Sequence, residues 1–183
     1  SDKIELADRF AEAIFVTLRE CAETLIADPL DETARANLML ASTFSHNDVT
    51  SMGKKANLVV HTLEHALSAL YPSIAHGHGL AVLYPAWLFV YFEELKEKLD
   101  RFARVVFNLH HEDIDTNAKE GILALKELFM RLGLTTTLSS LGIKREDIPT
   151  LADIVTENGT KELYHDQKNL TRYDIIKLYE SCF

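Results

Sequence analysis

The sequence contains few of the residues that stabilise or localise a secreted protein. Two cysteines, Cys21 and Cys182, lie far apart in no paired motif, which predicts reduced thiols and leaves room for at most one disulfide. No apolar run reaches the roughly 18 residues of a membrane helix. The N-terminal segment is acidic and amphipathic, without the basic and apolar regions of a signal peptide. These absences predict a cytoplasmic protein with no membrane partner.

Basic residues are also scarce. The chain has 19 lysines and arginines against 28 acidic residues, a formal charge of −9. This balance excludes a nucleic-acid-binding surface, which requires a basic stripe. What remains is typical of a globular domain, with 47% apolar and 26% charged residues. Because a chain of this length buries roughly 70% of its unfolded surface, we expect residues 1–183 to form a single domain without cross-links.

Strand signals are absent as well. No segment shows β-branched residues alternating with polar ones, whereas apolar residues recur at spacings of three and four along most of the chain. The fold class that we predict is therefore all-α, with eight or so helices. The expected helices span residues 4–27, 31–45, 54–70, 80–92, 95–109, 118–132, 145–155 and a terminal segment opened by Thr171.

Capping residues and helix breakers divide these helices. Asp31 is expected to cap the second helix, and Thr171 with Asp174 forms the capping-box pattern of the last one. Gly133 follows the sixth helix at the position of a C′ glycine. Pro85 lies inside the fourth helix, where it predicts a kink or a boundary between two shorter helices.

Four of the eight histidines, His61, His65, His76 and His78, lie close together in the sequence. His61 and His65 are four residues apart on a helix, so their rings share one face. His76 follows the break at Tyr71, where the chain can turn back toward the same point. Imidazole suits zinc or ferrous iron, and we interpret the segment as a metal site that needs a carboxylate or another ligand from elsewhere.

The clustered histidines are not equivalent. We predict that His61 and His76 are metal ligands, whereas His65 is a ligand, a substrate-pocket residue or a proton carrier. His78 is interpreted as a solvent-exposed or helix-end residue. No role is assigned to the remaining histidines, which are His46, His110, His111 and His165.

The residues after His76 serve two expected purposes. Gly77 and Gly79 predict a tight turn in which the backbone adopts positive φ or approaches a ligand closely. The almost wholly apolar segment 80–92 is suited to a core or to a dimer interface, rather than to a cofactor site.

Two other functions fit the same residues. The segment His61-Thr62-Leu63-Glu64-His65 matches the H-x-x-E-H signature of a zinc peptidase, with Glu64 as general base. That interpretation leaves the following His-Gly-x-Gly unexplained. The chain could also be a free-standing helical module that binds a metal, and the gene context would separate this alternative from a part of an enzyme.

The motif H-x3-H-x2-S-A-x-Y, followed by H-G-x-G-L-A-V-L-x-P-A-W, resembles the metal-binding segment of the iron-containing (group III) alcohol dehydrogenases. The similarity is greatest to the NAD(P)H-dependent butanol dehydrogenase branch. ADRFAEAI near the N-terminus, DPLDETARANLMLAST and the closing LTRYDIIKLY also resemble that branch, in the same order. The resemblance covers essentially the whole chain.

The resemblance implies a dehydroquinate-synthase-like architecture, in which this chain is the C-terminal helical domain and the N-terminal nucleotide-binding domain is absent. The family binds Fe²⁺, or sometimes Zn²⁺, through one aspartate and three histidines. Two of these positions map onto His61 and His76. The others belong to an Asp-x3-His motif that would precede Ser1. His65 maps onto an additional histidine near substrate and nicotinamide, and this implies a catalytic role.

The implied reaction is hydride transfer between NAD(P)(H) and a primary alcohol or aldehyde such as butanol. The metal would polarise the substrate oxygen, and His65 would relay the hydroxyl proton. NAD(P)H would bind through the N-terminal domain, and the whole enzyme is expected to be a homodimer. We therefore expect the 183-residue chain alone to bind metal weakly and to be inactive.

Overall fold

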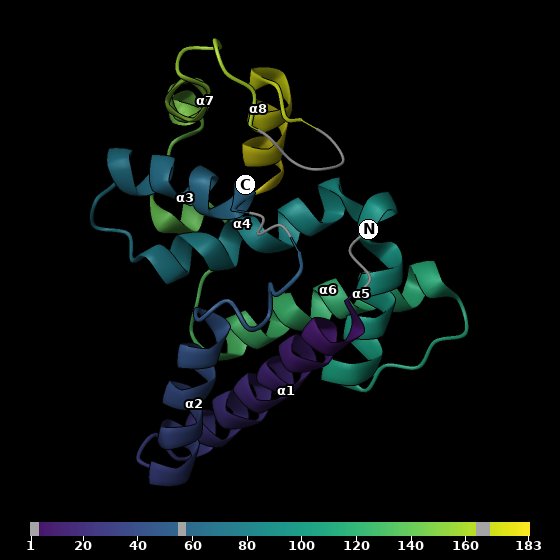
Figure 1. The fold of residues 1–183 in the computed structure, drawn as a ribbon. Helices are drawn as coiled ribbons and strands as arrows, with labels where there is room; N and C mark the ends of the chain where they lie inside the picture. The colour runs from purple at the N-terminus through teal and green to yellow at the C-terminus, as the bar shows by residue number, and fades with distance from the viewer. Residues whose placement is uncertain (1–3, 55–57, 164–168) are drawn as a thin grey trace. The chain divides into compact units, whose positions relative to one another are not determined.

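The computed structural model describes residues 4–54, 58–163 and 169–183, which are mainly helical (Figure 1). These residues contain no β-strand, and Leu163 and Leu170 form an isolated bridge. The prediction of an all-α protein is confirmed. The helices are α1 (Glu5–Ala27), α2 (Glu32–Ser45), α3 (Val59–Leu70), α4 (His76–Val90), α5 (Phe92–Phe107), α6 (Ile114–Arg131), the short 3-10 helices η1 (Ser139–Leu141) and η2 (Arg145–Asp147), α7 (Ile148–Thr156) and α8 (Arg172–Ser181).

The chain divides into two compact units. The first contains residues 1–56 and 96–124, and the second contains residues 57–95 and 125–183. Helices α5 and α6 contribute residues to both units. All three clustered histidines of the predicted metal site lie in the second unit, so this unit alone positions the site.

In the first unit, α1 packs along α2 (Figure 1). Helix α1 ends at the residue before Asp28-Pro29, because a helical conformation is disfavoured before proline. Asp31 then caps α2 by accepting a hydrogen bond of 2.7 Å from the amide of Ala34. The capping role predicted for Asp31 is confirmed.

Helices α5 and α6 approach each other closely at Gly121 in the first unit. A Cβ atom added to Gly121 would lie 2.6 Å from the Cβ of Ala103, which is fully buried. Glycine is therefore required here by the distance between two backbones. The surrounding core consists of small and branched apolar side chains, among them Leu99, Val106, Ala118 and Ile122.

The second unit is built around α3. Helix α3 packs against α4 and α7, and α8 packs against α4 and α7 in turn. The buried hydroxyl of Tyr179 on α8 donates a hydrogen bond of 2.7 Å to the backbone carbonyl of Leu63. Leu63 and Leu67 are completely buried. One face of α3 is thus fixed in the core, and this determines which of its side chains remain accessible.

Predicted helix ends in this unit are partly confirmed. Thr171 and Asp174 form the expected capping box at the start of α8. Gly133 has φ +81°, and its amide bonds to the carbonyl of Met130, as a C′ glycine requires. Helix α3, in contrast, begins at Val59 rather than near residue 54, and residues 55–57 lie outside the described part of the chain.

The start of α4 differs from the sequence expectation. Gly77 and Gly79 do not form a positive-φ turn, since they belong to the first turn of α4, which begins at His76 instead of Leu80. Hydrogen bonds from the amides of His78 and Gly79 to the carbonyl of Ala75 start the helix. The reason is tertiary: this turn packs directly against α3, and Gly79 is buried there.

Helix α4 also continues through Pro85 as far as Val90, so Pro85 is not a boundary between two helices. The break occurs at Tyr91, and α5 follows directly. Trp87 and Tyr91 are buried, as expected for core residues, whereas Phe89 on the same helix is 42% exposed. No helix in the described ranges is both long and apolar enough to cross a membrane.

Candidate metal centre

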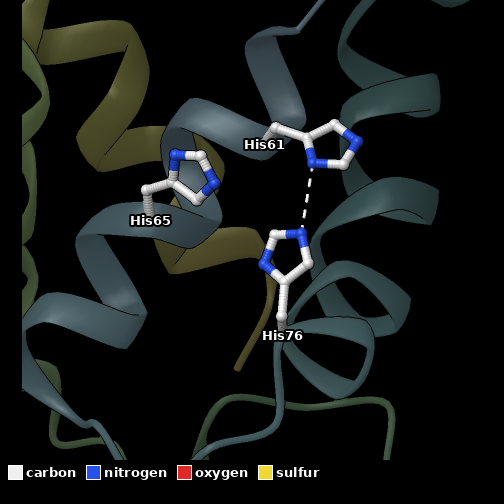
Figure 2. A group of neighbouring side chains, drawn as sticks. All are labelled: His61, His65 and His76. Carbon is white, nitrogen blue, oxygen red and sulfur yellow. Dashed lines mark hydrogen bonds between the residues drawn. The ribbon is translucent and has the colours of Figure 1, made fainter. Parts of the chain in front are cut away.

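Two helices bring three histidine side chains to one place (Figure 2). His61 and His65 project from α3 one turn apart, and His76 is the first residue of α4. The connection between the helices contains a tight turn, closed by a hydrogen bond of 3.0 Å from the amide of Ile74 to the carbonyl of Tyr71. This turn reverses the chain, so the His76 ring comes to lie beside both rings of α3.

The ring nitrogens converge as metal ligands do. One nitrogen from each of His61, His65 and His76 lies within 4.8 Å of the others. The shortest separation, between His61 Nδ1 and His76 Nε2, is 3.2 Å. Two histidine nitrogens on a tetrahedral ion are about 3.3–3.4 Å apart if each bond is about 2.0–2.1 Å long. The separation of these two nitrogens, which are hydrogen-bonded to each other here, is close to that of two ligands on one ion.

His65 is close to this pair, with its ring centroid 5.4 Å from that of His76 and 6.3 Å from that of His61. Its side chain is exposed, whereas His61 is half-buried. The side of the cluster that carries His65 is thus accessible to a small molecule. This placement is compatible with a ligand or with a residue that contacts substrate.

A buried carboxylate lies on the other side of His76. Glu64 is 0% exposed, and its Oε2 is hydrogen-bonded to His76 Nδ1. Its Oε1 accepts a second hydrogen bond, of 2.7 Å, from Ser68 Oγ. Sequence reasoning considered Glu64 only as the base of a peptidase motif. Buried and engaged by two donors, Glu64 is not directed toward the accessible side of the cluster, which argues against that motif.

His78 is separate from the cluster. Its Nε2 accepts a hydrogen bond of 2.9 Å from the backbone amide of Thr135, so the ring holds the start of α4 against the loop after α6. His46 and His110 pair with neighbouring side chains, Ser45 and Asn108. His165 lies outside the described residues.

The described residues supply an incomplete ligand set. The metal-capable group found among them consists of the three histidines and contains no carboxylate directed at the same point. Glu64 is hydrogen-bonded to Nδ1 of His76 instead. The expectation that the site takes a carboxylate or another ligand from elsewhere stays a prediction.

The described residues thus form an all-α chain in which two packed helices carry a compact three-histidine cluster. Residues 2–183 match the model of the Fe-containing alcohol dehydrogenase family, C-terminal. The chain belongs to the iron-containing alcohol dehydrogenase family, and it corresponds to the C-terminal part of its members. The family resemblance inferred from the sequence is thereby confirmed.

Named relatives agree with this assignment. NADH-dependent butanol dehydrogenase A of Clostridium acetobutylicum is 34% identical over an alignment of 182 positions, and the alignment covers 96% of this chain and 45% of that protein. The crystal structure of NADH-dependent butanol dehydrogenase A from Thermotoga maritima is 31% identical, with a TM-score of 0.88 over 97% of this chain and 46% of that one.

The aldehyde reductase YqhD from E. coli has a similar fold. Its substrate- and cofactor-free structure is 28% identical, with a TM-score of 0.87 over 100% of this chain and 48% of that one. The chain thus spans about half the length of the relatives that it matches. The helical fold is shared along the whole chain, while the other half of each relative has no counterpart in these 183 residues.

Proposed function

We propose that this chain is the metal-binding domain of an enzyme that transfers hydride between NAD(P)(H) and a primary alcohol or aldehyde such as butanol. The observation that carries the proposal is the 3.2 Å separation of His61 Nδ1 and His76 Nε2 within a converging cluster. Family membership supports it, as do relatives named NADH-dependent butanol dehydrogenase and NADPH-dependent aldehyde reductase.

The proposed ligands within this chain are His61 and His76, and the metal is Fe²⁺ or, as an alternative, Zn²⁺. Imidazole nitrogen suits both ions. The remaining aspartate and histidine are assigned to the Asp-x3-His motif expected before Ser1. When bound, the metal acts as a Lewis acid toward the substrate oxygen. The task of the two histidines is to hold it at the end of α3, next to the accessible side of the cluster.

His65 is proposed as a catalytic residue that holds and relays the hydroxyl proton. It is exposed, and its ring lies 5.4 Å from that of His76, so a substrate close to the metal ligands would be within its reach. An imidazole is suited to proton transfer because its ordinary pKa, about 6.5, is close to neutral pH. A third metal ligand is the competing role for the same side chain.

The partners of this domain are proposed by family. The nicotinamide cofactor would bind through an N-terminal nucleotide-binding domain, and the complete enzyme would be a homodimer located in the cytoplasm. Because cofactor and half of the metal ligands lie elsewhere, the 183-residue chain by itself is expected to lack dehydrogenase activity and to bind metal weakly.

The decisive experiment compares the complete enzyme with the 183-residue chain. We expect the complete enzyme to contain about one divalent metal per subunit and to reduce butanal with NADH or NADPH. We expect the chain alone to show no turnover and only weak Co²⁺ binding. Robust NAD(P)H-linked aldehyde reduction by the chain alone would contradict the proposal, as would a complete enzyme whose activity survives His61→Ala unchanged.

The same assays separate the two roles of His65. A proton relay predicts that His65→Ala lowers kcat while the metal content stays unchanged, since general acid–base catalysis contributes about 10²–10⁴-fold. A metal ligand predicts loss of the ion together with activity.

A further inference from the structure

Glu64 is a buried ionisable residue that has no part in the proposed reaction. It is the only acidic residue of α3, and its side chain has 0% exposure although the neighbouring His65 is exposed. Placing a carboxylate in a core costs several kcal/mol unless hydrogen bonds compensate for the lost water. Such a residue needs a structural reason, and its contacts indicate one.

The two hydrogen bonds of Glu64 determine the state of the His76 ring. An ionised carboxylate can only accept hydrogen bonds, so with Glu64 ionised the hydrogen shared by His76 Nδ1 and Glu64 Oε2 belongs to Nδ1. The lone pair of His76 then lies on Nε2, the atom that is 3.2 Å from His61 Nδ1. Ser68 Oγ holds the other carboxylate oxygen at 2.7 Å and thereby fixes the direction of the group.

The absence of a side chain at Gly79 leaves room for the carboxylate of Glu64. A Cβ atom added to Gly79 would lie 2.8 Å from both Cγ and Oε1 of Glu64, closer than real contacts allow. Gly77, two residues earlier in the same helical turn, has nothing within 4 Å of the equivalent position. Of the two glycines in the His-Gly-x-Gly motif, the second is therefore required by Glu64.

We propose that Glu64 is a positioning residue that orients His76 for metal binding: it holds the hydrogen on Nδ1 and directs the Nε2 lone pair into the cluster. The inference rests on the proposed metal site. Histidine ligands commonly donate their second ring N–H to a carboxylate, which fixes the ring and strengthens the ligand, and loss of such a partner costs about 10–100-fold in metal affinity.

The first test is a Co²⁺ titration of the metal-free complete enzyme, monitored by the visible absorption of the bound ion. Glu64→Leu fills the same space but cannot accept a hydrogen bond, and we expect it to weaken Co²⁺ binding about 10–100-fold. Glu64→Gln keeps an acceptor for His76 Nδ1 and a donor for Ser68, so it should retain most of the affinity. Gly77→Ala is the matched control and should bind as the wild type does.

The second test reads the His76 ring directly, without metal. Long-range ¹H–¹⁵N spectra distinguish a ring that is protonated at Nδ1 from one that is protonated at Nε2. We expect His76 to be protonated at Nδ1 in the wild type and in Glu64→Gln. In Glu64→Leu, the preference for Nδ1 should be lost. A residue that only filled space would not change this spectrum, and far-UV circular dichroism verifies that each variant folds.

The outcomes separate the two proposals. If the wild type binds Co²⁺ and Glu64→Leu folds and binds equally well, the role of Glu64 is overturned while the metal site stands. If the wild type binds no Co²⁺ but the tautomer changes in Glu64→Leu, Glu64 orients His76 and the metal site fails. If Glu64→Leu does not fold, the Glu64→Gln variant tests the proposal. A His76 ring protonated at Nδ1, together with near wild-type Co²⁺ affinity, supports the proposal. A ring protonated at Nε2 with wild-type Co²⁺ affinity overturns it.

Discussion

Two helix contacts in this protein each depend on a glycine, and they differ in what the glycine makes room for. At Gly121 the space is taken by the backbone and Cβ of Ala103, and the contact is apolar. At Gly79 the space is taken by the carboxylate of Glu64, which bonds to His76. The first contact serves packing alone, whereas the second brings a charged group behind a candidate metal ligand. The same residue type thus makes room for an apolar contact in one unit and for a buried carboxylate in the other.

The largest effect is expected on metal binding at the histidine cluster, which lies beside the Gly79 contact. We predict that His61→Ala lowers the Co²⁺ affinity of the complete enzyme more than about 100-fold, because loss of a ligand should exceed the 10–100-fold effect of a supporting residue. His78→Ala is the control of the same residue type, since His78 bonds to Thr135 and lies outside the cluster. Equal Co²⁺ affinities of His61→Ala and His78→Ala would contradict the assignment of His61 as a metal ligand.

A substitution at the apolar contact should change the stability of the protein and leave its metal affinity unchanged. We predict that Gly121→Ala lowers the free energy of unfolding by about 1–3 kcal/mol, the usual cost of overpacking, because the new Cβ lies 2.6 Å from that of Ala103. Urea denaturation measures the loss, and Co²⁺ affinity should not change. Adding Ala103→Gly should recover part of the stability. If Gly121→Ala is as stable as the wild type, α5 and α6 can move apart at little cost in free energy.

The polar contact can be tested with a double-mutant cycle. Gly79→Ala should weaken Co²⁺ binding and reduce stability, since the added Cβ meets Glu64 at 2.8 Å. In a Glu64→Ser background the same substitution should be nearly neutral, with a coupling free energy of about 0.5–3 kcal/mol between the two positions. Gly77→Ala, with open space around it, should not couple to Glu64. Additive effects at Gly79 and Glu64 would contradict a direct contact.

A smaller effect is expected from the buried groups that hold α8 in the second unit. Burial raises the pKa of the Cys182 thiol to about 12, and burial also raises the pKa of Tyr179. Both groups fold in the neutral form, so their contribution is complete below the ordinary cysteine pKa of about 8.5 and is lost as the pH rises toward the folded value.

For Cys182 the loss should reach about 1.4 kcal/mol at pH 9.5, one pH unit above the ordinary pKa. Urea denaturation between pH 7 and pH 10 measures this decline, which Cys182→Ala should reduce. The first unit supplies the comparison, because the Gly121→Ala penalty should be the same at each pH. A free energy of unfolding that stays constant up to pH 10 would contradict the prediction.

Helices and their ends were the part of the fold most accessible from sequence. The spacing of apolar residues predicted α1 and α2 closely. Asp31, Thr171 and Gly133 correctly marked the start of α2, the start of α8 and the end of α6. These signals are local, since a cap bonds to an amide or carbonyl only a few residues away. Where a helix started for a tertiary reason, as α4 does at His76, the local signal was misleading.

Glycine and proline were the main source of error. Gly77 and Gly79 predicted a turn because glycine tolerates positive φ, but both lie in a helix. Pro85 predicted a kink or a boundary, and the boundary is wrong because α4 continues to Val90. In both cases the packing of α4 against neighbouring helices outweighs the preference of single residues, and no pattern within the segment carries that information.

From the sequence alone, helical spacing placed His61 and His65 on one face, and the break after Tyr71 allowed His76 to return to them. Only the tertiary structure decided that His61 Nδ1 and His76 Nε2 lie 3.2 Å apart. It also decided that His78 bonds to Thr135 and that Glu64 bonds to His76 Nδ1. The reason is physical: periodicity determines the face of a helix, whereas the partner of a buried carboxylate depends on which helices pack together.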